Sequence, residues 1–86
     1  MKKTITINGQ KTKVNEEVTA VNKVSNGNID TWDLLIKVEG KEYNGLYQAI
    51  TTWNKKTKVP SCKFICIKTG ESFKDNQKKM LEHLLN

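Results

Sequence analysis

The dipeptide Asn8-Gly9 stands between two segments in which apolar and polar residues alternate, and this arrangement constrains the fold more than any other feature of the chain. Asn-Gly is the preferred centre of a two-residue type I′ turn, whose twist matches that of two antiparallel strands. The pattern therefore predicts an N-terminal β-hairpin with the facing pairs Ile7 and Gln10, Ile5 and Thr12, and Lys3 and Val14.

Further strands and two helices are predicted after this hairpin. Strands are expected over residues 18–24, 32–38, 41–43 and 62–68, where alternation or short apolar runs lie between turn-forming residues. A first helix is expected from Asn44 to about Thr57, because Leu46, Ala49, Ile50 and Trp53 recur at helical spacing and Pro60 lies just beyond. A second helix is expected over residues 73–85.

The order of these elements predicts the fold class. Residues 1–86 are expected to form a single small α+β domain, with an antiparallel-dominated sheet of four or five strands and two helices in the order β-β-β-β-α-β-α. A core of this size is thin, so either a monomer or a homodimer is compatible with the length.

The basic residues of the chain are all lysines: there are 15 of them, no arginine, and a formal net charge of +6. Lysine is attracted to polyanions but lacks the planar fork with which arginine recognises guanine or a phosphate. Asparagine is abundant too, and AT-rich codons favour both residues at the expense of arginine. The charge therefore has two open explanations, attraction to a partner or the codon bias of a low-GC bacterium or its phage.

Catalytic and metal-binding patterns are not found in the sequence. Cys62 and Cys66 are expected on one face of a strand, about 13 Å apart, too far for a disulfide. Together with His83 they do not have the spacing of a structural zinc site, and His83 is expected on the solvent face of the last helix, away from both thiols. We therefore expect no enzyme activity, no metal and no cofactor, and reactive side chains that do not converge.

Two surfaces are candidates for binding. The flank of the expected first helix offers a docking or base-stacking surface made of Tyr47, Thr51, Asn54, Lys55, Lys56 and Lys58. The polar face of the sheet offers a surface for polyanions made of Thr4, Thr6, Lys11, Lys13, Lys23 and Lys37.

These features favour a small binding protein of the cytoplasm, since neither a secretory leader nor a membrane span is recognisable. We expect a product of a phage or mobile element that docks on a host protein or nucleoprotein and blocks it, as anti-defence inhibitors do. The alternative is a lysine-rich module that binds nucleic acid largely without regard to its sequence.

Overall fold

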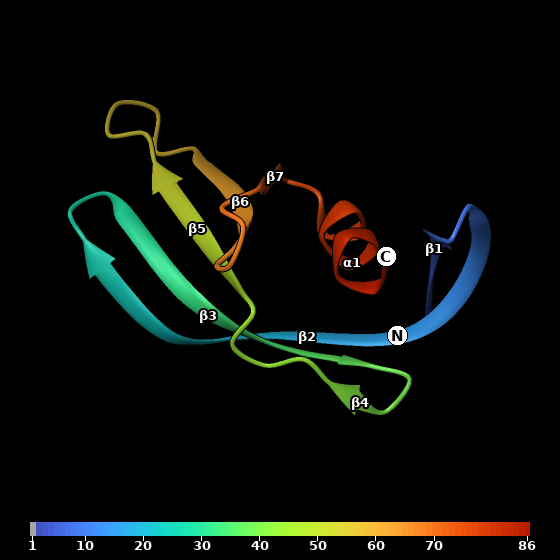
Figure 1. The fold of residues 1–86 in the computed structure, drawn as a ribbon. Coiled ribbons are helices and arrows are strands. Elements are labelled where there is room, and N and C mark those ends of the chain that lie inside the picture. The colour runs from blue at the N-terminus through green and yellow to red at the C-terminus, as the bar shows by residue number, and fades with distance from the viewer. Residues whose placement is uncertain (1) are drawn as a thin grey trace.

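The computed structural model describes residues 2–86, and within that range it contains one helix and seven strands (Figure 1). The strands are β1 Lys2–Ile7, β2 Gln10–Asn26, β3 Ile29–Val38, β4 Lys41–Glu42, β5 Tyr47–Trp53, β6 Pro60–Cys66 and β7 Ser72–Lys74, and the helix is α1 Gln77–Leu85.

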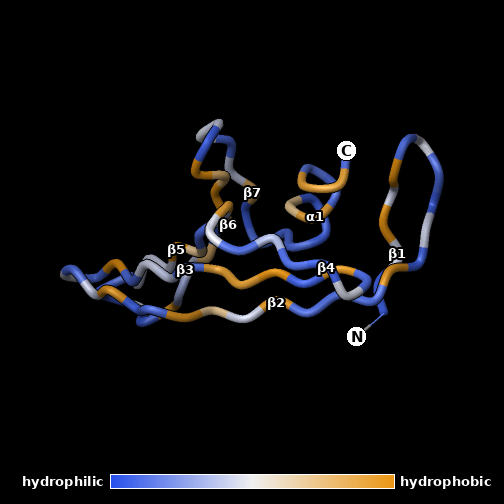
Figure 2. The backbone as a smooth tube through the Cα atoms, turned by 60° about the horizontal axis from the view of Figure 1, so that its bottom comes forward, coloured by the Kyte–Doolittle hydropathy of each residue, from blue (hydrophilic) through white to orange (hydrophobic). Residues whose placement is uncertain are grey.

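The strands form one curled antiparallel sheet in the order β1-β2-β3-β5-β6-β7, with β4 paired to the end of β3. The long strand β2 produces the curl, because its residues up to Asn15 pair with β1 and its residues from Glu16 onward pair with β3. The β1–β2 hairpin therefore rises at one end of the molecule, and α1 lies between it and the β6–β7 segment (Figures 1 and 2).

Alternation along the strands places the core on the concave side of this sheet. Leu34, Ile36 and Val38 of β3 are buried there, and Met80 and Leu81 of α1 are completely buried against the same cluster. A sheet with only one apolar side must be covered, and α1 provides the cover. The other buried apolar members of the cluster are Ile5, Val14, Tyr47, Ala49 and Cys66.

The N-terminal hairpin has the predicted register. Ile7 pairs with Gln10, Ile5 with Thr12 and Lys3 with Val14, so this prediction is confirmed. Asn8 and Gly9 both have positive φ angles, 50° and 78°, as a type I′ turn requires.

The predicted α+β fold with two helices is wrong, because the first of those helices does not form. Residues 47–53 are strand β5, paired on one side with β3 and on the other with β6. Gly45, with a φ of 76°, lies in the turn that leads into this strand. A run that holds Ile50, Thr51, Thr52 and two aromatic residues suits a sheet better than a helix.

The second helix is confirmed in part, since it begins later than predicted. Residues 72–74 form the short edge strand β7, and Asp75, with a φ of 47°, turns the chain away from it. The side chain of Asn76 accepts a hydrogen bond from the Lys79 amide at 2.9 Å and caps α1. The helix therefore begins after Asn76, four residues later than predicted.

The end of α1 also covers the free edge of β1. A carboxylate oxygen of Glu82 accepts a hydrogen bond from the Thr6 amide at 2.7 Å, and Asn86 Oδ1 accepts one from the Asn8 amide at 2.7 Å. The Asn86 side-chain amide in turn donates to the Thr6 carbonyl oxygen at 2.9 Å. Polar groups that an edge strand would leave open are thus occupied by side chains of the helix.

Across residues 2–86, the only helix is the nine-residue α1, so no helix has the length and apolar character needed to cross a lipid bilayer.

Candidate functional site

The positive charge of the chain is concentrated in the β5–β6 hairpin and its flanks. Residues 43–70 contain five lysines and no acidic residue, whereas the rest of the chain contains ten lysines and nine acidic residues. Five of the six net charges are therefore carried by fewer than a third of the residues. Codon bias acts along the whole chain, so it does not explain this uneven distribution.

Three of these lysines lie in the loop that joins β5 to β6. The Asn54 side-chain oxygen accepts hydrogen bonds from the amides of Lys56 and Thr57, at 2.9 and 3.1 Å, which folds the loop back on itself. The Asn54 amide closes the loop by donating to the Val59 carbonyl oxygen at 3.1 Å. Lys55, Lys56 and Lys58 are all exposed on this ordered loop.

The turn of the β2–β3 hairpin lies beside this loop. The Trp53 amide donates to the Asn28 carbonyl oxygen at 2.8 Å, and the Asn28 side-chain amide donates back to the Trp53 carbonyl oxygen at 2.9 Å. The two hairpins therefore end together, at the end of the molecule opposite the β1–β2 hairpin (Figure 1).

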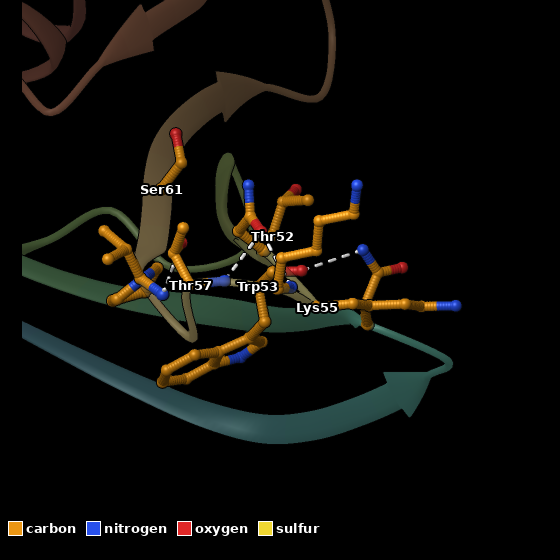
Figure 3. A pocket seen from close by; sticks show the side chains of 10 residues that line it. Thr52, Trp53, Lys55, Thr57 and Ser61 are labelled. Atoms are coloured by element: carbon orange, nitrogen blue, oxygen red, sulfur yellow. Dashed lines mark hydrogen bonds between the residues drawn. The ribbon is translucent and has the colours of Figure 1, made fainter.

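Large apolar side chains are exposed at the same end. Val24 and Val59 are 63% and 60% exposed, and Ile29 and Trp53 are about 40% exposed. We call this end, with Val24, Ile29, Trp53, Lys55, Lys56, Lys58 and Val59, the tip surface. The strand register places Trp53 on the concave side of the sheet and Val24 and Ile29 on the convex side, so apolar groups flank the lysine loop on both sides. Its loop side forms an open pocket of about 760 Å³, in which the Trp53 ring lies toward the β2–β3 hairpin (Figure 3).

Trp53 is held in place by a carboxylate. Its indole N–H donates to a carboxylate oxygen of Asp30 at 3.0 Å. Hydrogen bonds from the Ser25 hydroxyl and then from this indole, with a smaller contribution from the charge of Lys23, lower the pKa of Asp30 below its ordinary value. The tip surface therefore holds a fixed aromatic ring with an ionised group at its edge.

The first predicted surface is divided by the strand geometry of β5. Tyr47 is buried, Thr51 is half-buried in the strand, and Asn54 closes the loop, so these side chains do not form a common exposed patch. Lys55, Lys56 and Lys58 remain together on the tip surface. Sequence reasoning missed Trp53 and Val59 as exposed groups. Alternation from Tyr47 through Ala49 and Thr51 to Trp53 was the signal for a strand, but it places Trp53 on the face of the buried Tyr47 and Ala49 and gives no sign of its exposure.

The second predicted surface is divided as well. Thr4 faces Lys13 and Thr6 faces Lys11 on the outer side of the β1–β2 hairpin, and both lysines are exposed, so these four residues do lie together. Lys37, by contrast, lies between Glu17 on β2 and Glu42 on β4, where two carboxylates offset its charge.

Lys23 belongs to neither group, because a bulge in β2 redirects it. Val21 pairs with Asp33 and Val24 with Thr31, so two residues, Asn22 and Lys23, lie opposite Trp32 alone. The Lys23 ammonium group consequently lies 5.5 Å from the centre of the Trp32 ring, a cation–π contact.

The expectation that His83 faces solvent is wrong. His83 Nδ1 lies 2.6 Å from the hydroxyl oxygen of the buried Tyr47, and Nε2 lies 3.5 Å from a carboxylate oxygen of Glu71. Tyr47 pairs with Cys66 across the sheet, so an imidazole, a phenol, a carboxylate and a thiol do converge. The His83 side of α1 faces the sheet because the helix packs between β1 on one side and β6 and β7 on the other.

The chain was compared with known proteins, and no family model, no curated protein and no solved structure matches it.

Proposed function

We propose that this protein is a non-enzymatic binding module that docks through the tip surface on an acidic face of another protein or nucleoprotein, and blocks it. The observation that carries the proposal is the coincidence, at one end of the molecule, of the acid-free lysine loop with four exposed apolar side chains. Interfaces commonly combine an apolar centre with a charged rim that steers the encounter.

The apolar groups favour a protein partner over nucleic acid. Val24 and Val59 are the most exposed of the large apolar residues, and aliphatic side chains gain little from a phosphate backbone. Trp53 could stack on a base, but the Asp30 carboxylate at its indole N–H would repel the neighbouring phosphate. The chain also has no arginine with which to recognise a base edge.

Direct binding to nucleic acid is the second candidate, and it has an observation of its own. Lys11 and Lys13 are exposed on the outer side of the β1–β2 hairpin, beside Thr4 and Thr6. Such a face would contact phosphates and bind with little preference for sequence. The two candidates therefore place their contacts at opposite ends of the molecule, which makes them separable by mutation.

Composition supports the origin and compartment that we assign. A chain rich in lysine and asparagine and free of arginine fits an AT-rich genome, and we place it among phage or mobile-element products that block a host protein, in the manner of anti-defence inhibitors. Cys62 and Cys66 are free thiols, which fits the reducing cytoplasm of the host.

The test compares two charge variants that act at opposite ends. The tip variant carries Lys55→Gln, Lys56→Gln and Lys58→Gln, and the hairpin variant carries Lys11→Gln and Lys13→Gln. Each is used, tagged, to recover partners from a low-GC bacterial lysate with and without nuclease. Binding of each to 20-nucleotide single- and double-stranded DNA is measured in parallel at 50 and 200 mM salt.

If the protein docks on another protein, the parent and the hairpin variant should recover one defined partner after nuclease treatment. The tip variant should not recover it. Val59→Ser should weaken that recovery, whereas Ile67→Ser, a matched change at a 53% exposed residue in the β6–β7 turn, should not. DNA binding that falls steeply with salt and is lost only in the hairpin variant would replace this proposal with the second candidate.

A further inference from the structure

Two hydrogen bonds and one ion-pair contact connect the thiol of Cys66 to solvent through three other titratable side chains. The Tyr47 hydroxyl is hydrogen-bonded to the Cys66 thiol and lies 2.6 Å from His83 Nδ1. His83 Nε2 lies 3.5 Å from Glu71, whose side chain is 60% exposed. The four groups come from β6, β5, α1 and the β6–β7 turn, so only the folded chain brings them together.

Hydrogen-bond donors surround the Cys66 thiol. Hydrogen bonds from the Thr69 hydroxyl, then from the Thr69 backbone amide, and to a lesser degree from the Lys68 amide and the Tyr47 hydroxyl lower the pKa of the thiol, against the opposing effect of burial. Thr69 Oγ1 accepts a hydrogen bond from the Glu71 amide at 3.2 Å, so the hydroxyl proton is available to donate to sulfur.

Tyr47 can pass a proton in either direction without becoming an anion. Burial, with the nearby charges of Cys66 and Glu71, raises the pKa of Tyr47 to about 12, so its hydroxyl stays protonated at neutral pH. In one state the thiol donates to Tyr47, Tyr47 donates to His83 Nδ1, and Nε2 faces the Glu71 carboxylate at 3.5 Å. When these two protons each move one bond along, the result is a thiolate and an imidazolium, and both hydrogen bonds of Tyr47 are retained.

A cavity gives small molecules access to this chain. It has a volume of about 440 Å³ and is lined by Tyr47, Cys66, Thr69 and His83, with Leu46 and Leu84 among its apolar walls. Lys68 also lines it. Phe73 packs on the His83 ring with 5.2 Å between centroids and so fixes the imidazole from the other side.

We propose that Cys66 is a modification site: the Tyr47–His83–Glu71 chain draws the proton from its thiol, and the resulting thiolate reacts with small uncharged electrophiles that enter the cavity. With iodoacetamide as the probe, sulfur attacks the methylene carbon and forms the C–S bond. The C–I bond breaks, iodide leaves with its electron pair, and the thiol proton stays on the imidazole.

The test follows alkylation of Cys66 by iodoacetamide in the Cys62→Ser protein, by mass spectrometry from pH 5 to 10. Restricted access alone would slow the reaction equally at every pH, and desolvation would raise the midpoint of the pH–rate profile. A lowered midpoint is therefore the informative result. It should lie below the midpoint for Cys62 in the Cys66→Ser protein and below that of the urea-unfolded chain. The rate should rise in proportion to iodoacetamide concentration, as direct entry requires.

Variants separate the effect of the Tyr47–His83–Glu71 chain from that of the hydrogen bonds donated by Thr69 and Lys68. Tyr47→Phe interrupts the chain and His83→Gln removes its base, so both should shift the midpoint upward and slow the reaction at pH 7. Glu71→Gln is a mild change at an exposed side chain that should preserve the fold and still shift the midpoint upward. The proposal would be overturned if the Cys66 midpoint in the Cys62→Ser protein were no lower than that of the unfolded chain. It would also be overturned if Glu71→Gln and His83→Gln left the midpoint unchanged, or if the alkylation rate were limited by unfolding.

Discussion

The change Leu81→Ala tests whether α1 holds the curled sheet together. Leu81 is completely buried in the core cluster, midway along the helix. Replacing a buried leucine by alanine costs roughly 2–5 kcal/mol, through lost transfer free energy and the cavity left behind. The free energy of unfolding of a chain of this length is on the order of 4–13 kcal/mol. A loss of about 3 kcal/mol would therefore remove a large share of it.

The expected result is a large fall in thermal stability. For a domain of this size each kcal/mol shifts Tm by about 4–8 °C, so Leu81→Ala should lower Tm by about 12–24 °C. Thermal unfolding is followed by circular dichroism and by tryptophan fluorescence, and urea unfolding checks the free energy. The matched control is Ile67→Ala, an aliphatic residue that is 53% exposed and should change stability by less than about 0.5 kcal/mol.

The comparison between these two variants decides the question. If Leu81→Ala lowers Tm by no more than Ile67→Ala does, then α1 does not fill the concave side of the sheet in solution. The packing described for Ile5, Leu34 and Ile36, which form the same core cluster, would then be refuted too.

Two further predictions concern hydrogen bonds to carboxylates. Glu82→Ala should lower the free energy of unfolding by about 1–3 kcal/mol and speed hydrogen exchange at the Thr6 amide, because it removes the acceptor at 2.7 Å. Glu82→Gln keeps an acceptor and should have a smaller effect. Unchanged protection of the Thr6 amide in Glu82→Ala would contradict the edge contact. Asp30 should titrate by NMR below 3.8, and Trp53→Phe should raise its pKa. The stability that Asp30 contributes should be complete above about pH 4 and be lost as pH falls through its lower folded-state pKa. A pKa of Asp30 that does not change in Trp53→Phe would contradict the Trp53 contact.

Local chemistry explains which elements could be predicted. The Asn8-Gly9 turn and its register depend on residues within one hairpin, so the sequence carries all the information needed. Residues 47–53 were different, because Leu46, Ala49, Ile50 and Trp53 satisfy a helical period while the alternation from Tyr47 to Trp53 satisfies a strand period. The choice is made by the edges of β3 and β6, which lie elsewhere in the chain and supply hydrogen bonds on both sides.

The same difference, between local chemistry and contacts with distant segments, explains which parts of the candidate sites could be predicted. The lysines at 55, 56 and 58 were recognisable as an exposed basic group, but the exposure of Trp53 depends on a neighbouring hairpin that ends at the same place. Tyr47 and His83 were both assigned to solvent-facing positions, yet they meet because α1 packs into the concave side of the sheet. Contacts between residues 36 positions apart cannot be read from local periodicity.

The amino-acid sequence alone therefore determined the N-terminal hairpin, the positive charge without arginine and the amphipathic C-terminal helix, since each depends on neighbouring residues or on composition. Only the tertiary structure decided that β5 is a strand, that the lysine loop shares an end with four exposed apolar side chains, and that a thiol, a phenol, an imidazole and a carboxylate form one chain. The physical reason is that sheet pairing and helix docking are set by partners distant in sequence, whose edges and surfaces exist only after the chain has curled.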